Sequence, residues 1–161
     1  MKWDKKGVTL TELVVVMAVL SVLASVTMPI YRMSIKRAKE TTLRRELRTM
    51  RDAIDLYKKY SDDGRISREA GGSGYPKTLE ALVEGVNIVN QAAIQPGQTQ
   101  LPNKIRFLRK VPVDPMTRKA EWGMRSNQDE PDSGIWGGQD VFDVYSMSEG
   151  TALDGTLYKD W

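Results

Sequence analysis

A single carboxylate, that of Glu12, stands inside an apolar stretch near the start of the chain. It is the only charged side chain in residues 8–31, and residues 13–28 carry no charge at all. A charge inside a membrane helix costs about 3 kcal/mol near the bilayer centre, and less near the interface. Such a group normally has a partner, but the next basic side chain, Arg32, lies too far along a helix to reach it. We therefore expect the partner to be another chain or a newly formed amino terminus.

The bond between Gly7 and Val8 is where such a terminus would form. Cleavage after Gly7 creates an α-amino group on Val8, four residues before Glu12. In a low-dielectric medium an ion pair is strongly favoured over an unpaired charge. The spacing is therefore compatible with a cleaved chain whose new amine neutralises a buried carboxylate.

The residue types that are missing narrow the chemistry further. The 161-residue chain contains no cysteine and no histidine. Disulfides, thiolate metal sites and thiol nucleophiles are therefore excluded, and so is catalysis by Ser-His-Asp or Cys-His groups. Zinc sites built from histidine are excluded for the same reason. These exclusions argue against an enzyme.

The element that carries the carboxylate is predicted to be an apolar helix. About 20 apolar residues span the hydrocarbon core of a bilayer, and residues 8–31 are long enough. One interpretation is a secretory signal peptide, although its apolar core is normally about 7–15 residues long and only Ala24-Ser25 suggests a cleavage site. A second is a plain single-span anchor, with the lysines of residues 1–7 on the cytoplasmic side. A third is the cleaved segment described above.

Residues 6–13, Lys-Gly-Val-Thr-Leu-Thr-Glu-Leu, resemble the class III signal of type IV pilins and pseudopilins. The resemblance implies that a prepilin peptidase cuts between Gly7 and Val8 and N-methylates Val8. It also implies that Glu12 is the fifth residue of the mature chain. Two positions depart from the family pattern, since Val8 stands where Phe is usual and Thr11 stands where Ile or Leu is usual.

The resemblance also implies a role for Glu12 in filament assembly. When a subunit enters the filament, this carboxylate is expected to meet the Val8 ammonium group of a neighbouring subunit. Because this ion pair stabilises one axial offset between subunits, Glu12 is expected to set the register of the subunits in the filament. The alternative is a glutamate at the membrane interface that merely caps the positive end of the helix.

A long helix is predicted from about Leu10 to Tyr60. At 1.5 Å per residue it is about 75 Å long. Apolar residues recur in its second half at three- and four-residue steps or multiples of them, namely at Ile35, Leu43, Leu47, Met50, Ile54 and Tyr57. Pro29 interrupts the hydrogen-bond ladder, and the resemblance implies local melting there in assembled filaments. The alternative is a kink without functional meaning.

These features predict an α+β protein, in which a long N-terminal α-helix packs on a small globular head with a short antiparallel β-sheet. The expected segments are a leader at 1–7, a transmembrane or filament-core helix at 8–31, an amphipathic helix at 32–60 and a head at 61–161. Within the head we expect a helix over 75–83, a loop over 85–104, an extended stretch at 105–108, a proline-fixed turn over 111–117, and strands over 121–125 and 141–146. Trp122, Trp136 and Trp161 are expected to anchor the core and loops.

Charge is distributed unevenly along the chain. Residues 32–60 carry ten basic and four acidic side chains, whereas residues 61–161 carry eleven basic and fifteen acidic ones. This pattern is typical of positive residues that flank a membrane segment or meet acidic surfaces on copies of the same chain, and it does not indicate a nucleic-acid binder. The basic helix face is expected to be solvated or to contact other subunits; it consists of Arg44, Arg45, Arg48 and Arg51.

The order of motifs in the head resembles the G-type major pseudopilin of type II secretion. The matching stretches are 75–83, 108–115 and 141–146, with Asp160-Trp161 at the end. That family member binds calcium in its C-terminal loop, which requires several oxygen ligands. The candidates here are Glu149, Asp154 and Asp160, with Asp143 or backbone carbonyls assisting.

The alternative for this loop is turn chemistry, with Asp154-Gly155 in a tight hairpin and Trp161 packed down as a staple. A second acidic cluster at 129–132 is expected to be a solvated turn. Apart from calcium, no cofactor is expected.

The resemblance implies a subunit that polymerises into a helical filament, the pseudopilus, and drives protein export. The implied partners are further copies of the chain, a prepilin peptidase, an assembly platform and ATPase, and minor pseudopilins. The implied location is the inner membrane, with a single span and the head in the periplasm. Two alternatives stay open: a type IV pilin for adhesion, motility or DNA uptake, and a membrane-anchored periplasmic binding protein or enzyme.

Overall fold

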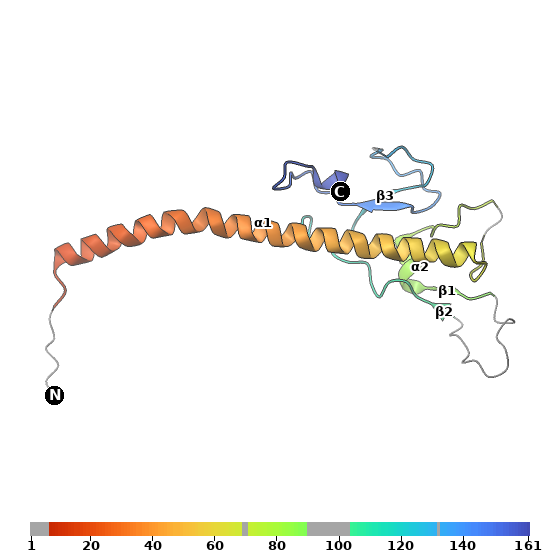
Figure 1. Ribbon diagram of the computed structural model, residues 1–161, viewed down its shortest axis with the longest axis horizontal. Coiled ribbons are helices and arrows are strands. Elements are labelled where there is room, and N and C mark those ends of the chain that lie inside the picture. Colours follow the sequence, from red (N-terminus) through yellow and green to blue (C-terminus); the bar gives the residue numbers. More distant parts are fainter. Residues whose placement is uncertain (1–6, 69–70, 90–103, 132) are drawn as a thin grey trace, which may run out of the picture. The chain divides into compact units, whose positions relative to one another are not determined.

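The computed structural model describes residues 7–68, 71–89, 104–131 and 133–161 (Figure 1). The chain divides into two compact units, one that reaches to Ala38 and one from Lys39 to Trp161. Of the predicted leader, only Gly7 belongs to the described residues, and most of the predicted 85–104 loop also lies outside them.

Helix α1 (Leu10–Asp62) confirms the predicted long helix. Thr9 caps its first turn, because the Thr9 hydroxyl accepts a hydrogen bond from the Glu12 amide at 3.3 Å. Pro29 lies inside the helix and does not end it. The melting at Pro29 that the resemblance implies concerns assembled filaments, and it stays a prediction.

In the first unit, the large apolar side chains of α1 face outward all round the helix. Residues 13–17 are all exposed, and five successive positions cover the full circumference of an α-helix. This part of α1 is long and apolar enough to cross a membrane.

In the second unit, α1 buries one stripe of side chains. Leu43, Leu47, Met50 and Ile54 are at most 2% exposed, and their spacing places them on one face of the helix. Ile35, which the sequence pattern assigns to the same stripe, belongs to the first unit and is 40% exposed. The stripe packs into a single core; its other buried members are Ala53, Leu79, Leu82, Leu108, Trp122, Val141, Val144, Ala152 and Tyr158.

Helix α2 (Leu79–Glu84) is shorter than predicted and begins later. Its N-cap is Thr78, whose hydroxyl accepts from the Ala81 amide at 3.3 Å, and threonine is a favourable N-cap residue. Pro76 therefore precedes the helix, and its carbonyl accepts a hydrogen bond from the Val141 amide at 2.7 Å.

Two small antiparallel sheets replace the single sheet that was predicted. Strand β1 (Val86–Asn87) pairs with β2 (Lys104–Ile105), and β3 (Gly123–Arg125) pairs with β4 (Asp143–Tyr145). The α+β class with short antiparallel strands is thus confirmed, although β1 falls in a segment predicted to be loop.

The register of β3 on β4 places Gly123 opposite Tyr145. A Cβ atom at Gly123 would collide with the Tyr145 ring. Position 123 therefore requires glycine because the aromatic ring occupies the space of a side chain.

Candidate functional site

The predicted cleavage point lies in an open stretch of backbone. Residues 7–9 have no regular secondary structure, and Gly7, Val8 and Thr9 are all exposed. A Cβ atom built on Gly7 would have no neighbour within 4 Å. The Gly7–Val8 bond therefore lies in front of the helix, where nothing in the described chain covers it.

Glu12 lies in the first turn of α1 and is exposed. Its amide donates to the Thr9 hydroxyl, as in the first half of a capping box. Within the described residues, no ion pair joins the Glu12 carboxylate to a basic side chain. The position fits both predicted roles, because a carboxylate in the first turn is favoured by the helix dipole and stays available to a neighbouring chain.

The C-terminal loop forms the tight hairpin that was the alternative to a calcium site. Thr151 and Leu157 make an antiparallel bridge, and the Ala152 amide donates to the Thr156 carbonyl at 2.7 Å. Gly155 has φ +88°, the left-handed conformation that a three-residue hairpin loop requires at this position. We call residues 151–161 the C-terminal hairpin.

Buried Glu40 of α1 holds this hairpin at two points. One Glu40 oxygen, Oε1, accepts from the Leu153 amide and from the Tyr158 hydroxyl, both at 2.9 Å. Glu40 is 6% exposed and Tyr158 is 4% exposed. Burial, and then the hydrogen bond and charge of Glu40, raise the pKa of the Tyr158 phenol to about 12.

Arg51 of α1 holds the strand that leads into the hairpin, and also the end of the chain. Its Nε donates to Asp143 at 2.6 Å, and its Nη2 donates to the carbonyls of Val144 at 3.1 Å and Trp161 at 2.7 Å. Arg51 therefore has partners within the chain that the sequence did not predict, while 38% of its side chain stays exposed.

Arg44 makes two contacts with the hairpin. Its guanidinium group pairs with Asp154 at 3.1 Å and lies 4.1 Å from the centre of the Trp161 ring. The Trp161 indole donates to the Thr156 hydroxyl at 2.7 Å. Trp161 thus packs as the predicted staple.

The other two tryptophans are also anchors, as predicted. The Trp122 indole donates to the Pro112 carbonyl at 2.9 Å, and the Trp136 indole donates to the Asp140 carbonyl at 2.7 Å. The indole N–H of each tryptophan therefore has a hydrogen-bond acceptor within the chain, while the ring contributes to packing.

The predicted calcium ligands are not brought together. Glu149, Asp154 and Asp160 are all exposed, and among the described residues no group of three or more acidic side chains is placed to hold a metal ion. The Thr156 hydroxyl and amide, and then Arg44, lower the pKa of Asp154. Asp143 is paired with Arg51 and lies 3.6 Å from Arg125. This set of groups does not fit a calcium ion, which needs several free oxygen ligands.

The second acidic cluster organises a turn. Asp129 Oδ2 accepts from the Ser126 amide at 2.7 Å and from the Gly137 amide at 3.0 Å. These two backbone hydrogen bonds, Ser126 first, lower the pKa of Asp129. Asp129 therefore closes the 126–137 loop, while Asp132 lies outside the described residues.

A buried carboxylate that sequence reasoning missed is Asp114, which is fully buried. It accepts from the Ser146 hydroxyl at 2.6 Å and from the Met116 amide at 2.7 Å. The proline-fixed turn over 111–117 is confirmed, and Asp114 ties it to the residue that follows β4. An aspartate directly before Pro115 is the available signal, because Asp in a turn often bonds the backbone two residues on.

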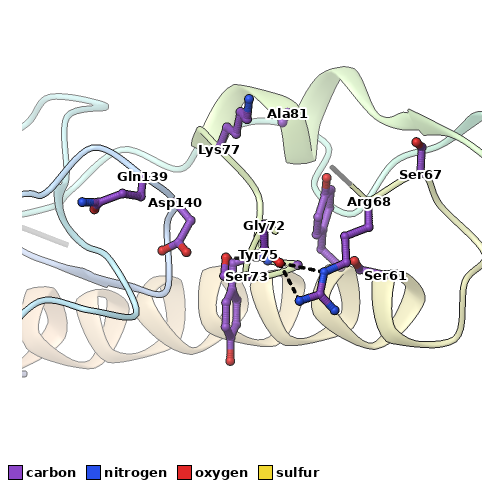
Figure 2. Close-up of a pocket in the computed structure, with 12 residues that line it drawn as sticks. Ser61, Ser67, Arg68, Gly72, Ser73, Tyr75, Lys77, Ala81, Gln139 and Asp140 are labelled. Atoms are coloured by element: carbon purple, nitrogen blue, oxygen red, sulfur yellow. Dashed lines mark hydrogen bonds between the residues drawn. The ribbon is translucent and has the colours of Figure 1, made fainter. Parts of the chain in front are cut away.

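A pocket of about 250 Å³ lies where the end of α1 meets the 72–77 segment (Figure 2). Arg68 reaches across it, as Figure 2 shows, and donates from Nε and Nη2 to the Gly72 carbonyl. Asp140 lines the pocket and accepts from the Asn127 amide at 2.9 Å. These contacts join loop residues to one another, so both charged groups have partners within the head.

Two comparisons with known proteins bear on the N-terminus and the head. Residues 4–28 match the family described as the prokaryotic N-terminal methylation motif. The chain carries a prepilin-type N-terminus. Gly7, Val8 and Glu12 all lie within this prepilin-type segment, and Pro29 follows it directly.

The similarity extends well beyond the prepilin-type segment. The chain is 28% identical over 144 residues to the type II secretion system core protein G of Pseudomonas aeruginosa, covering 89% of this chain and 83% of that protein. No solved structure matches the chain. The two matches confirm the predicted resemblance to type IV pilins and pseudopilins, and in particular to the G-type pseudopilin.

Proposed function

We propose that this chain is a structural subunit that polymerises into a pseudopilus and drives protein export by type II secretion. The observation that carries the proposal is the prepilin-type segment at residues 4–28, followed by a head that is similar in sequence to core protein G. The helix that follows the cleavage point is exposed and apolar all round, as a helix needs to be if it moves from lipid into a bundle of identical helices.

Processing is the first step of the proposed mechanism. A prepilin peptidase adds water across the Gly7–Val8 peptide bond, which leaves a carboxylate on Gly7 and an amine on Val8. The amine then takes a methyl group from a methyl sulfonium donor, which leaves as a thioether while the amine releases a proton. The exposed, non-helical residues 7–9 support this step, because a peptidase binds extended backbone more readily than helix.

Assembly is the second step. Before assembly, α1 anchors the subunit in the inner membrane and the head lies in the periplasm. As an assembly platform and ATPase extract the subunit, the Glu12 carboxylate leaves the lipid and pairs with the Val8 amine of a neighbouring copy. An unpaired carboxylate in a low-dielectric core is costly, so only the correct axial offset is stable. Minor pseudopilins are the proposed partners at the filament tip.

The proposed subunit performs no chemistry itself. The absence of cysteine and histidine, and the use of Glu40, Arg51 and Asp114 to hold the head together, support a structural role.

The test of processing is the intact mass of the membrane-extracted protein, made with and without a co-expressed prepilin peptidase. We expect the peptidase to remove residues 1–7 and add one methyl group. Gly7→Ala is the informative variant, because an added methyl at this position meets nothing in the described chain. Loss of cleavage in Gly7→Ala would then reflect the peptidase, and an uncut wild-type mass would refute the proposal.

The test of assembly compares Glu12→Gln with Glu12→Asp in cells that produce filaments. Both variants keep the amide that Thr9 caps, and only Glu12→Asp keeps the charge. We expect Glu12→Gln to be cleaved normally but to yield few filaments, and Glu12→Asp to restore part of the yield. Equal filament yields from the two variants would show that the charge is not used.

A further inference from the structure

We propose that the C-terminal hairpin of this chain is fastened to α1 by protein side chains alone, and that the head closes without calcium. The contacts of the hairpin carry this inference, which concerns the head and does not depend on the proposed function.

The nearby carboxylates are already matched by arginines. Asp154 pairs with Arg44 at 3.1 Å, and Asp143 pairs with Arg51 at 2.6 Å and lies 3.6 Å from Arg125. A calcium ion bound to either carboxylate would lie beside a guanidinium group of like charge, and such a contact is repulsive. These two carboxylates therefore have their counter-ions within the chain.

Several backbone oxygen atoms in the hairpin and directly before it are engaged as well. The Gly150, Ala152 and Thr156 carbonyls accept from the Tyr158, Gly155 and Ala152 amides, respectively. The Trp161 carbonyl accepts from Arg51. Calcium takes about 6–8 oxygen ligands, so an ion bound at this place would compete with these hydrogen bonds for the same oxygen atoms.

Arg44 takes the place of a bound cation, because its positive charge holds the acidic turn at Asp154 against the rest of the head. Its charge faces Asp154 at the tip of the hairpin, and its planar group covers the Trp161 ring at the base. Glu40 fixes the segment between them through Leu153 and Tyr158. Arg44 and Glu40, both on α1, therefore fasten the hairpin to the helix.

The test uses the full chain in detergent and follows thermal unfolding of the head by tryptophan fluorescence. Wild type is measured in EGTA and in millimolar calcium chloride, and terbium is titrated as a luminescent probe that tryptophan sensitises. Arg44→Gln is compared with Arg48→Gln in both solutions. Arg48 lines a surface groove together with Arg44, Asp154 and Trp161, and it carries the same charge as Arg44. Among the described residues, however, it makes no hydrogen bond or ion pair with the hairpin.

We expect the wild-type Tm to agree within about 1 °C between EGTA and calcium, with no terbium signal that calcium competes away. We expect Arg44→Gln to lower the Tm by about 3–6 °C and Arg48→Gln by less than about 1 °C. A calcium-dependent rise of several degrees in wild type, or saturable terbium binding displaced by calcium, would overturn the proposal. Equal Tm values for the two arginine variants would overturn the assignment to Arg44.

Discussion

Replacing Glu40 tests how the hairpin is held to α1 more directly than any other single change. In Glu40→Ala, the Tyr158 hydroxyl loses its acceptor in a site that is 4% exposed, which costs about 2 kcal/mol. The Leu153 amide also loses its acceptor, but it lies nearer to water and costs about 1 kcal/mol. The sum is about 3 kcal/mol, or a fall in Tm of about 12 °C for a unit of this size.

Glu40→Gln separates the hydrogen bonds from the charge. Because Oε1 alone accepts both hydrogen bonds, the glutamine carbonyl keeps both and loses only the charge, which costs about 1 kcal/mol. Glu46→Ala and Glu46→Gln are the matched controls, since Glu46 lies on the same helix and pairs with exposed Arg45 at 3.0 Å. Each control is expected to change stability by less than about 0.5 kcal/mol.

The assay is thermal and urea unfolding of the full chain in detergent, with a double-mutant cycle that combines Glu40→Ala and Tyr158→Phe. The cycle is expected to give a coupling free energy of about 1 kcal/mol, because the two side chains share a hydrogen bond. The reasoning fails if Glu40→Ala unfolds within about 2 °C of Glu46→Ala. It also fails if the two changes in the cycle are additive.

Three further predictions concern the head. The pKa of Tyr158 is raised in the folded chain, so the unfolded chain releases the phenol proton at a lower pH. The free energy of unfolding should therefore be full below pH 10 and should fall by about 2 kcal/mol between pH 10 and 12. Urea titrations should show a smaller fall in Tyr158→Phe, and an equal pH dependence of wild type and Tyr158→Phe would contradict this. Gly123→Ala should destabilise by about 2 kcal/mol because of the Tyr145 ring, and a Tm equal to wild type would show that the ring moves freely. Ser146→Ala should cost about 2 kcal/mol by urea unfolding, because buried Asp114 loses a hydrogen bond at 2.6 Å. The control Ser133→Ala should cost less than about 0.5 kcal/mol, because among the described residues the half-buried Ser133 hydroxyl bonds only Ile135, two residues on.

Sequence reasoning worked best where the determining interactions are local. The prediction of a helix from about Leu10 to Tyr60 agrees with α1, which ends at Asp62. The burial of Leu43, Leu47, Met50 and Ile54 confirms the predicted apolar face. The hairpin at Asp154-Gly155 was predicted as an alternative because turn preferences depend on neighbouring residues.

Sequence reasoning failed where a side chain finds a partner far along the chain. Glu40 bonds residues 113 and 118 positions away, and Arg51 bonds residues up to 110 positions away. On an amphipathic helix, the sequence alone does not distinguish such charged side chains from solvated ones, because their partners come close only in the folded chain. Strand β1 was missed for a related reason, since two residues are too few to show alternation.

The start of α2 shows how one local signal overrides another. Proline in the first helical turn is common, which placed the predicted start near Pro76. The Thr78 hydroxyl instead caps the Ala81 amide, and the helix begins after the residue that satisfies a free backbone donor.

The long separation between Glu40 and its partners has a consequence for synthesis. When the ribosome has made Glu40, its partners Leu153 and Tyr158 are still 113 and 118 residues from being translated. The head cannot close over Leu43 and Leu47 until Tyr158 has been made, and contacts between such distant residues form slowly. Until then the nascent chain exposes an apolar helix face, which is a surface prone to aggregation.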